Sequence, residues 1–154
     1  MARFNWLSAS LEPMRGSPEG FDGSYAEIGP VIGGEHLAGS VYEVPPGRKL
    51  FPYHWEAAQE EWLLVLSGTP TLRTPEGTRE LRAGDLACFV CGAEGAHQVS
   101  NGSDAPARIL MLSDRLATNV VVYPDSGKVG VRTPALRPNH GLDATLEYWE
   151  GEGG

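Results

Sequence analysis

The sequence predicts an all-β fold in which short strands are joined by tight turns. Apolar or alternating runs recur about every ten residues from residue 40 to residue 123, with glycine or proline turns between them. The 20 glycines and 12 prolines are scattered along the chain, which favours many short ordered elements over disorder. No helical periodicity of useful length interrupts this pattern. The expected architecture is therefore a β-sandwich or β-barrel.

The individual strands are predicted from apolar runs that end at turn signals. They cover residues 40–44, 61–66, 69–74, 78–81, 85–90, 98–100, 108–113 and 119–123. Residues 1–24 are rich in glycine and proline, and we expect them to form an irregular arm that wraps the domain. Residues 143–149 fit either a short helix or a strand, and the pattern does not decide between the two.

Length and charge limit the classes of function. A chain of 154 residues fits a single domain, residues 1–154, built around one core. Its formal net charge of −8 repels phosphate backbones and anionic lipids, so neither nucleic acid nor a membrane is an expected partner. The first residues contain no continuous apolar stretch, so no secretion signal is expected and a cytoplasmic location is the default.

Four side chains have the spacing of a mononuclear metal site. His54 and Glu56 are two residues apart, so in a strand both point to the same face. Glu61 opens the next apolar run and can face them, and His97 arrives from a later strand. Imidazole nitrogens and carboxylate oxygens from three places in the chain are a suitable ligand set for one divalent cation. Each residue alone is more simply a surface carboxylate or a core histidine, but their joint spacing favours a metal.

The first half of this set resembles the first motif of the cupin superfamily. That motif has a glycine, then His-x-His, three or four residues, a glutamate, six residues and a glycine. Here Glu61 precedes Gly68 by the required gap, so Glu61 takes the glutamate position, and His54 takes the first histidine position. Gly47 precedes His54 with one residue more than the usual gap.

The second half is similar to the second cupin motif, which runs from glycine through a Pro-x-Gly turn to histidine and then asparagine. Gly84, Gly92, His97 and Asn101 match in order. Val90 stands where proline is usual, and the loop from Gly92 to His97 is longer by two residues.

The resemblance covers roughly residues 40–115 and implies a fold, a cofactor and a class of function. The implied fold is a small cupin-type jelly-roll barrel, often a homodimer, with one divalent metal at its inner face. The implied function is an enzyme acting on a small organic molecule. Among the reactions that the superfamily hosts, oxygen-dependent oxidation of a dioxygenase type comes first and isomerisation or epimerisation second. The rival is a non-enzymatic module that binds a small ligand or a metal.

Glu56 is the position where the chain departs from the first motif, because a histidine is usual there. Glu56 either remains a fourth ligand, which adds oxygen and favours iron or manganese over zinc or nickel, or it acts as a catalytic acid or base. In the second case His54, Glu61 and His97 form a two-histidine, one-carboxylate set like that of non-haem iron oxygenases. A third reading is that metal binding is weakened or lost.

Strand parity predicts the surroundings of the site. With Glu61 facing the metal, Leu63 and Val65 point inward, whereas Trp62, Leu64 and Leu66 point outward. Those three outward residues should be covered by the arm or by a second subunit, which favours a homodimer.

Basic residues are sparse near the ligands in the sequence. Arg48 and Lys49 precede the site, and Arg73 and Arg82 follow it. A phosphorylated substrate usually needs several cationic groups, so this distribution disfavours sugar-phosphate chemistry.

Overall fold

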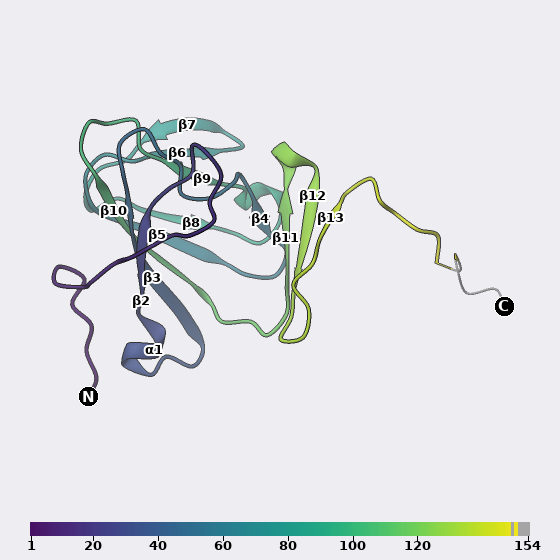
Figure 1. The fold of residues 1–154 in the computed structure, drawn as a ribbon, viewed down its shortest axis with the longest axis horizontal. Coiled ribbons are helices and arrows are strands. Elements are labelled where there is room, and N and C mark those ends of the chain that lie inside the picture. Colours follow the sequence, from purple (N-terminus) through teal and green to yellow (C-terminus); the bar gives the residue numbers. More distant parts are fainter. Residues whose placement is uncertain (149, 151–154) are drawn as a thin grey trace.

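The computed structural model describes residues 1–148 and 150 of the chain and is built mainly from antiparallel sheets (Figure 1). The largest sheet has six strands in the order β1 (Glu12–Pro13), β2 (Ser24–Glu27), β3 (Leu37–Val44), β10 (Ala107–Asp114), β5 (Glu61–Ser67) and β8 (Leu86–Phe89). A three-stranded sheet has the order β7 (Gly77–Glu80), β6 (Thr71–Thr74) and β9 (Gln98–Ser100). The all-β jelly-roll prediction is confirmed.

A further sheet stands at one end of the barrel. Its order is β13 (Asn139–Gly141), β12 (Lys128–Arg132), β11 (Asn119–Tyr123) and β4 (Trp55–Glu56). Figure 1 shows β11, β12 and β13 side by side, with the C-terminal tail leaving the body beyond them. The short helical elements are α1 (Gly29–Ile32), η1 (Ala93–Gly95) and η2 (Pro124–Ser126).

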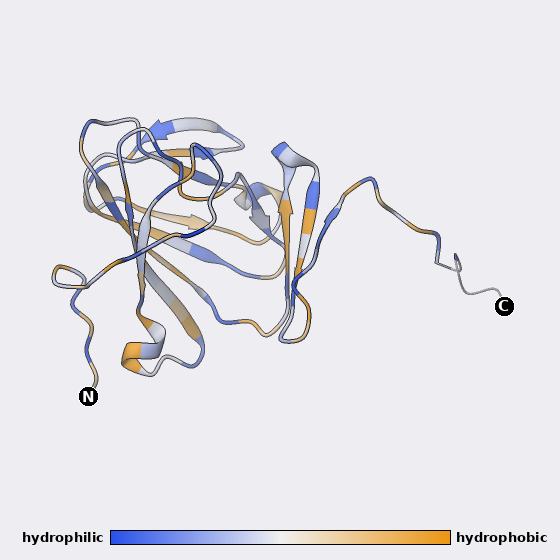
Figure 2. Ribbon diagram, viewed as in Figure 1, coloured by the Kyte–Doolittle hydropathy of each residue, from blue (hydrophilic) through white to orange (hydrophobic). Residues whose placement is uncertain are grey.

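The core lies between the six-stranded and the three-stranded sheets. The six-stranded sheet contributes Leu63, Val65 and Ile109, and the three-stranded sheet contributes Leu72 and Val99, all of which are buried. Strand β7, by contrast, is exposed along its whole length and hydrophilic at the edge of its sheet (Figure 2). Alternate residues of each central strand therefore fill the barrel, as the predicted parity requires.

Most predicted strands are present, and two match residue for residue. Strands β9 and β11 have the predicted bounds, and β3, β5, β8 and β10 differ from them by one to three residues at an end. Strands β12 and β13 were not predicted. Both are short, and the apolar pattern of β12 is interrupted by Gly130. Strand β12 forms because it pairs with β11, and β13 forms because it pairs with β12. Such long-range pairing is a tertiary effect that the local sequence pattern does not reveal. Residues 143–148 form neither helix nor strand, and Trp149 lies outside the described residues.

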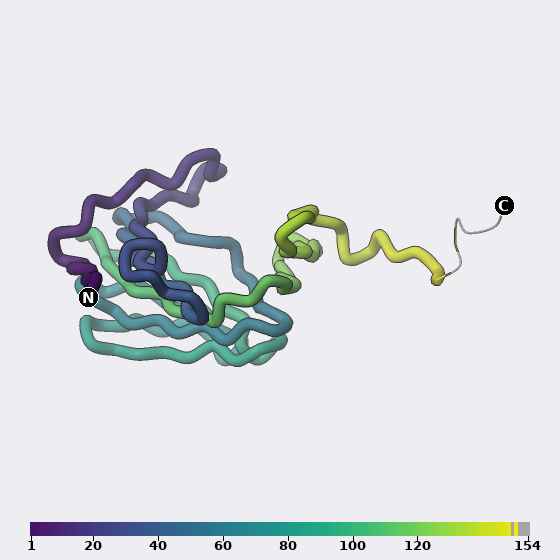
Figure 3. Tube along the Cα trace, turned by 90° about the horizontal axis from the view of Figure 1, so that it is seen from below, coloured from purple at the N-terminus to yellow at the C-terminus, as the bar shows by residue number. Residues whose placement is uncertain are grey.

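The N-terminal arm is largely irregular, as predicted, and runs along one side of the barrel (Figure 3). Its two-residue strand β1 pairs with β2, and Met14 packs against the core. The arm does not cover the outward face of β5, because Trp62 remains 42% exposed. Among the described residues, no helix has the length and apolar character needed to cross a bilayer.

Candidate metal centre

A reciprocal backbone pair brings the two histidines of the candidate site together. The His54 amide donates to the His97 carbonyl over 3.1 Å, and the His97 amide donates to the His54 carbonyl over 2.8 Å. The two rings consequently lie with centroids 4.6 Å apart. The Phe89 ring stacks on His97 at a centroid distance of 3.7 Å and restricts the orientation of that imidazole.

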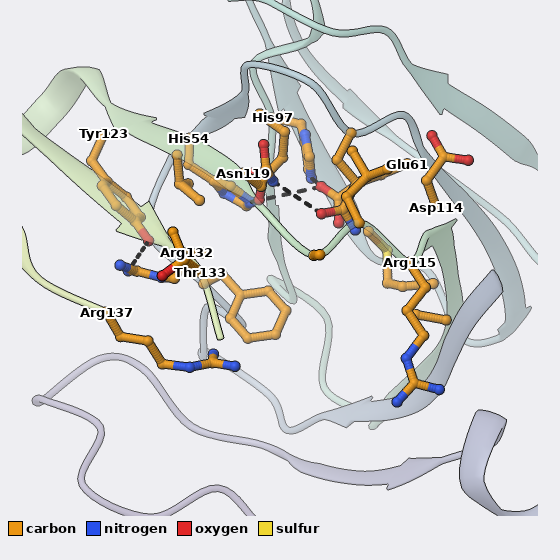
Figure 4. A pocket seen from close by; sticks show the side chains of 18 of the residues that line it. His54, Glu61, His97, Asp114, Arg115, Asn119, Tyr123, Arg132, Thr133 and Arg137 are labelled. Atoms are coloured by element: carbon orange, nitrogen blue, oxygen red, sulfur yellow. Dashed lines mark hydrogen bonds and ion pairs between the residues drawn. The ribbon is translucent and has the colours of Figure 1, made fainter. Parts of the chain in front are cut away.

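Glu61 completes a compact group with these histidines. It stands at the first position of β5, and its Oε2 atom lies 3.4 Å from His97 Nε2 and 3.8 Å from His54 Nε2. One ligand atom from each of the three residues lies within 4.8 Å of the others. Three converging donors at this spacing can surround a single cation (Figure 4).

Both imidazoles are held in the tautomer that a metal ligand requires. His54 Nδ1 lies 2.8 Å from the Pro52 carbonyl, and His97 Nδ1 lies 3.0 Å from the Gly95 carbonyl. A carbonyl oxygen only accepts, so each Nδ1 carries the hydrogen and each Nε2 presents its lone pair to the site. Burial lowers the pKa of His54, and burial together with the nearby His54 lowers the pKa of His97 to about 3. Both rings are therefore neutral near pH 7.

Glu61 carries the strongest indication that a cation belongs here. Its Oε2 atom is buried and has no hydrogen-bond partner among the described residues. Burial, with a smaller contribution from the negative charge of Glu56, raises the pKa of Glu61 to about 7. An unpaired buried carboxylate oxygen is costly, and a divalent cation would supply the missing partner.

Glu56 lies beside this group but is anchored elsewhere. Its Oε1 atom is 3.9 Å from His54 Nε2, while its Oε2 atom accepts a hydrogen bond from Asn119 Nδ2. Asn119 is buried and also donates to Gln59 Oε1 over 2.9 Å. Burial raises the pKa of Glu56, and the Asn119 hydrogen bond and the charge of Arg132 partly oppose that rise. One oxygen is thus tied to β11 and the other faces the site.

The site opens into a pocket of about 760 Å³, a volume typical of small-molecule sites. His54, Glu56, Glu61 and His97 all line it. Three arginines line it as well, namely Arg115, Arg132 and Arg137. Basic residues are sparse near the ligands in the sequence, but the fold brings these three to the pocket, so that sparseness is no longer an argument against a phosphorylated substrate.

The arginines were missed because all three follow the second motif in the sequence, and Arg132 and Arg137 lie well beyond it. Arg115 follows β10, Arg132 ends β12, and Arg137 lies in the loop between β12 and β13. Pairing of β10 with β5 places Arg115, and pairing of β4 with β11 and of β11 with β12 carries Arg132 and Arg137 to the pocket. No local signal in the sequence marks Arg132 and Arg137, because their position depends on a sheet that was only partly predicted.

The comparisons with known proteins agree with this architecture. A family model described as a cupin domain matches residues 40–113, and these residues include His54, Glu61 and His97. A sugar phosphate isomerase from Silicibacter pomeroyi, described as a member of a cupin superfamily, has a similar structure, with a TM-score of 0.83. The chain belongs to the cupin superfamily. The three arginines of this cupin lie outside the matched residues.

The similar structures span several activities. The Silicibacter pomeroyi protein is 22% identical, and the match covers 95% of this chain and 97% of that chain. A proposed sugar phosphate isomerase from Acidithiobacillus ferrooxidans is 26% identical, with 83% of this cupin and 81% of that chain covered and a TM-score of 0.78. A polyketide cyclase from Streptomyces resistomycificus is 19% identical, with 96% and 88% covered and a TM-score of 0.63. No curated protein matches the sequence.

Proposed function

We propose that this cupin is a metal-dependent enzyme that isomerises or epimerises a small hydroxy-carbonyl compound by proton transfer. The observation that carries the proposal is a second carboxylate, Glu56, beside the group formed by His54, Glu61 and His97. Such an arrangement separates two tasks, because three residues can hold a cation while the fourth moves a proton.

The residues fit a divalent cation. His54 Nε2, His97 Nε2 and a Glu61 oxygen are the donors, and the partnerless Glu61 Oε2 supports their assignment as ligands. When bound, the metal would polarise a substrate oxygen as a Lewis acid. Iron or manganese is favoured if Glu56 adds a further oxygen, and zinc or nickel would also accept this mixed nitrogen and oxygen set.

Glu56 is the residue that would move the proton. In an isomerisation it takes a proton from the hydroxyl-bearing carbon next to the substrate carbonyl and returns it to the former carbonyl carbon, while the hydroxyl proton moves to the former carbonyl oxygen. In an epimerisation Glu56 removes the proton, and water on the opposite face supplies the new one. Asn119 holds Glu56 Oε2, which leaves Oε1 directed toward the pocket. Burial raises the pKa of Glu56 above its usual value, which makes its carboxylate a stronger base than an exposed one.

Similar structures support this choice of reaction. Two of the proteins named above are described as sugar phosphate isomerases, and one of them is 26% identical to this chain. The sequence alone placed oxidation first and isomerisation second. The position of Glu56 beside the three candidate ligands supports the opposite order in this proposal.

The test is exchange of substrate hydrogen with solvent. The purified protein is incubated in D2O with a panel of aldoses, ketoses and their phosphates, and deuterium at the carbon next to the carbonyl is followed by NMR. We expect exchange that needs no O2 and that falls about 10²- to 10⁴-fold in Glu56→Gln, the usual effect of removing a positioned acid or base. Glu60→Gln is the matched control, because Glu60 is an exposed neighbouring carboxylate that bonds Trp62 instead of lining the pocket.

Oxygen-dependent oxidation is the second candidate. Two histidines and one carboxylate are the ligand set of many non-haem iron oxygenases, and His54, Glu61 and His97 have that composition. O2 consumption with product formation, in place of solvent exchange, would establish oxidation. A protein that binds panel members and a metal but performs neither reaction would be a binding module.

A further inference from the structure

We propose that the pocket binds an anionic end group of the substrate, a phosphate or a carboxylate, on the side where Arg132 and Arg137 lie. This inference rests on the proposed function, because it names the substrate class of the same pocket. It adds a contribution from β12 and the loop that follows it, which lie outside the residues matched by the cupin model.

The first observation is the position of the two guanidinium groups. Figure 4 shows Arg132 and Arg137 together on one side of the group formed by His54, Glu61 and His97, and Arg115 on the other side. All of these residues line one pocket. A substrate can therefore place its reactive carbons at the metal centre and extend its charged end toward Arg132 and Arg137.

The second observation is that neither cation forms a direct ion pair within the part of the chain that the structure describes, although Arg132 lies near enough to Glu56 for its charge to favour the ionised carboxylate. Elsewhere in the described chain Arg73 pairs with Asp125, Arg79 with Glu76, and Arg108 with Glu43. Neither Arg132 nor Arg137 forms an ion pair with any described carboxylate. The chain has 20 acidic and 12 basic residues, so acidic partners are abundant, and guanidinium groups left without one in a pocket suit an anionic ligand.

The third observation is that Arg132 is fixed in place by neutral acceptors. Its Nη1 donates to the Val131 and Pro138 carbonyls over 3.1 and 3.2 Å, and its Nη2 donates to Asn139 Oδ1 over 2.8 Å and to the Tyr123 hydroxyl over 3.4 Å. These bonds orient the guanidinium without neutralising its charge. Arg137 is exposed and forms no hydrogen bond with the described part of the chain, so it can close on an anion that Arg132 has positioned.

The charge of the pocket is consistent with this assignment. Its lining includes three carboxylates, Glu56, Glu61 and Asp114, and three guanidinium groups, so with neutral histidines and all three carboxylates ionised these charges cancel. A bound divalent cation would make the pocket positive. An anionic end group then restores neutrality, and the positive pocket would also attract it at a distance although the whole chain is acidic.

The experiment measures binding of two simple anions without turnover. Inorganic phosphate, and succinate in a parallel arm, are titrated into the full chain at constant ionic strength, and the rise in thermal unfolding temperature is converted to affinity. We expect the wild type to bind at least one anion and Arg137→Gln to weaken that binding about tenfold, the equivalent of about 1.4 kcal/mol. Preference for phosphate or for succinate identifies which end group the substrate carries.

Two control variants make the result specific. Arg79→Gln removes the same charge from a residue that does not line this pocket, and it should leave anion affinity unchanged. His54→Ala removes a candidate metal ligand and with it part of the positive charge of the pocket, so it should weaken anion binding without abolishing it. Arg132→Gln tests the second guanidinium, and Arg137→Gln keeps the test valid if that variant fails to fold.

Three outcomes would overturn the proposal. In the first, neither anion binds to the wild type. In the second, Arg79→Gln and Arg137→Gln weaken binding equally. In the third, His54→Ala abolishes binding while Arg137→Gln leaves it intact, which would assign the anion to the metal centre. The test is independent of the reaction, because anion binding can be retained in a protein that shows no solvent exchange. Failure of the proposed isomerisation would therefore leave the anion subsite standing, and the reverse also holds.

Discussion

Replacing Glu61 by glutamine should change how the stability of the metal-free protein depends on pH. Glutamine has the shape of a protonated glutamate but cannot ionise. In the wild type the folded chain retains the Glu61 proton up to a pKa of about 7, whereas the unfolded chain releases it near 4.5. Between these values the folded state holds more protons than the unfolded state, so the free energy of unfolding falls as pH rises.

The magnitude follows from the width of that interval. From 4.5 to about 7, at about 1.4 kcal/mol for each pH unit, the wild type should lose about 3 kcal/mol relative to Glu61→Gln. His54 and His97 act in the opposite direction, because their lowered pKa values make stability rise with pH up to about 6.5. Their effect is common to both proteins, so the difference between wild type and variant isolates Glu61.

The assay is urea unfolding of both chelator-treated proteins at several pH values from 4 to 8. Parallel curves for the two proteins would refute the conclusion that Glu61 is a buried, uncompensated carboxyl group. Calorimetric titration with Mn²⁺ at pH 6, in buffers of different protonation enthalpy, gives a second reading. The wild type should release about one proton on binding because the carboxylate must ionise, and Glu61→Gln should release none.

Three further predictions concern the scaffold. Asn101→Ala should lower the free energy of unfolding by about 2 kcal/mol or more, because Asn101 Nδ2 donates to the Val44 and Ala105 carbonyls and both would lose a partner. Urea unfolding measures this, and an unchanged midpoint of the urea transition would contradict it. Gly95→Ala should reduce metal affinity as well as stability, since a Cβ there would clash with the Val90 carbonyl oxygen and displace the Gly95 carbonyl that orients His97; metal titration checks it. Leu86, Leu112 and Trp62 share an exposed face of the large sheet, so the chain should sediment as a homodimer at micromolar concentration and Leu86→Glu should shift it to monomer. A wild-type monomer would contradict the assignment of that face as a dimer interface.

The barrel was predictable because its signals are local. Apolar runs such as residues 61–66 end at glycine turns, and the parity of Leu63 and Val65 reports directly which face is buried. The spacing of His54, Glu61 and His97 likewise anticipated their convergence, because the motif encodes strand positions on a known fold. The stretch just before His54 is different, because residues 50–53 form no strand and isolated bridges occur at Lys49 and His54 on either side of it.

The additional sheet was not predictable in the same way. Lys128–Arg132 has one interior glycine and two charged ends, and it becomes a strand because β11 offers it an unpaired edge. Arg132 and Arg137 therefore reach the pocket through long-range pairing, which a single sequence does not display. The same limit applies to Asn119, whose contact with Glu56 joins residues 63 positions apart.

The departure from the cupin motif and the additional sheet form one structural unit. Glu56 belongs to β4 and pairs with Val121 of β11, and Asn119 at the start of β11 pairs with Arg132 at the end of β12. Asn119 donates a hydrogen bond to the Glu56 carboxylate, and the charge of Arg132 favours its ionised form. An imidazole at position 56 would gain nothing from the nearby guanidinium, and its protonated form would be repelled by it. A carboxylate at this position is therefore the side chain that the sheet is built to hold, which explains why a residue that breaks the motif can still be fixed in place beside the candidate metal centre.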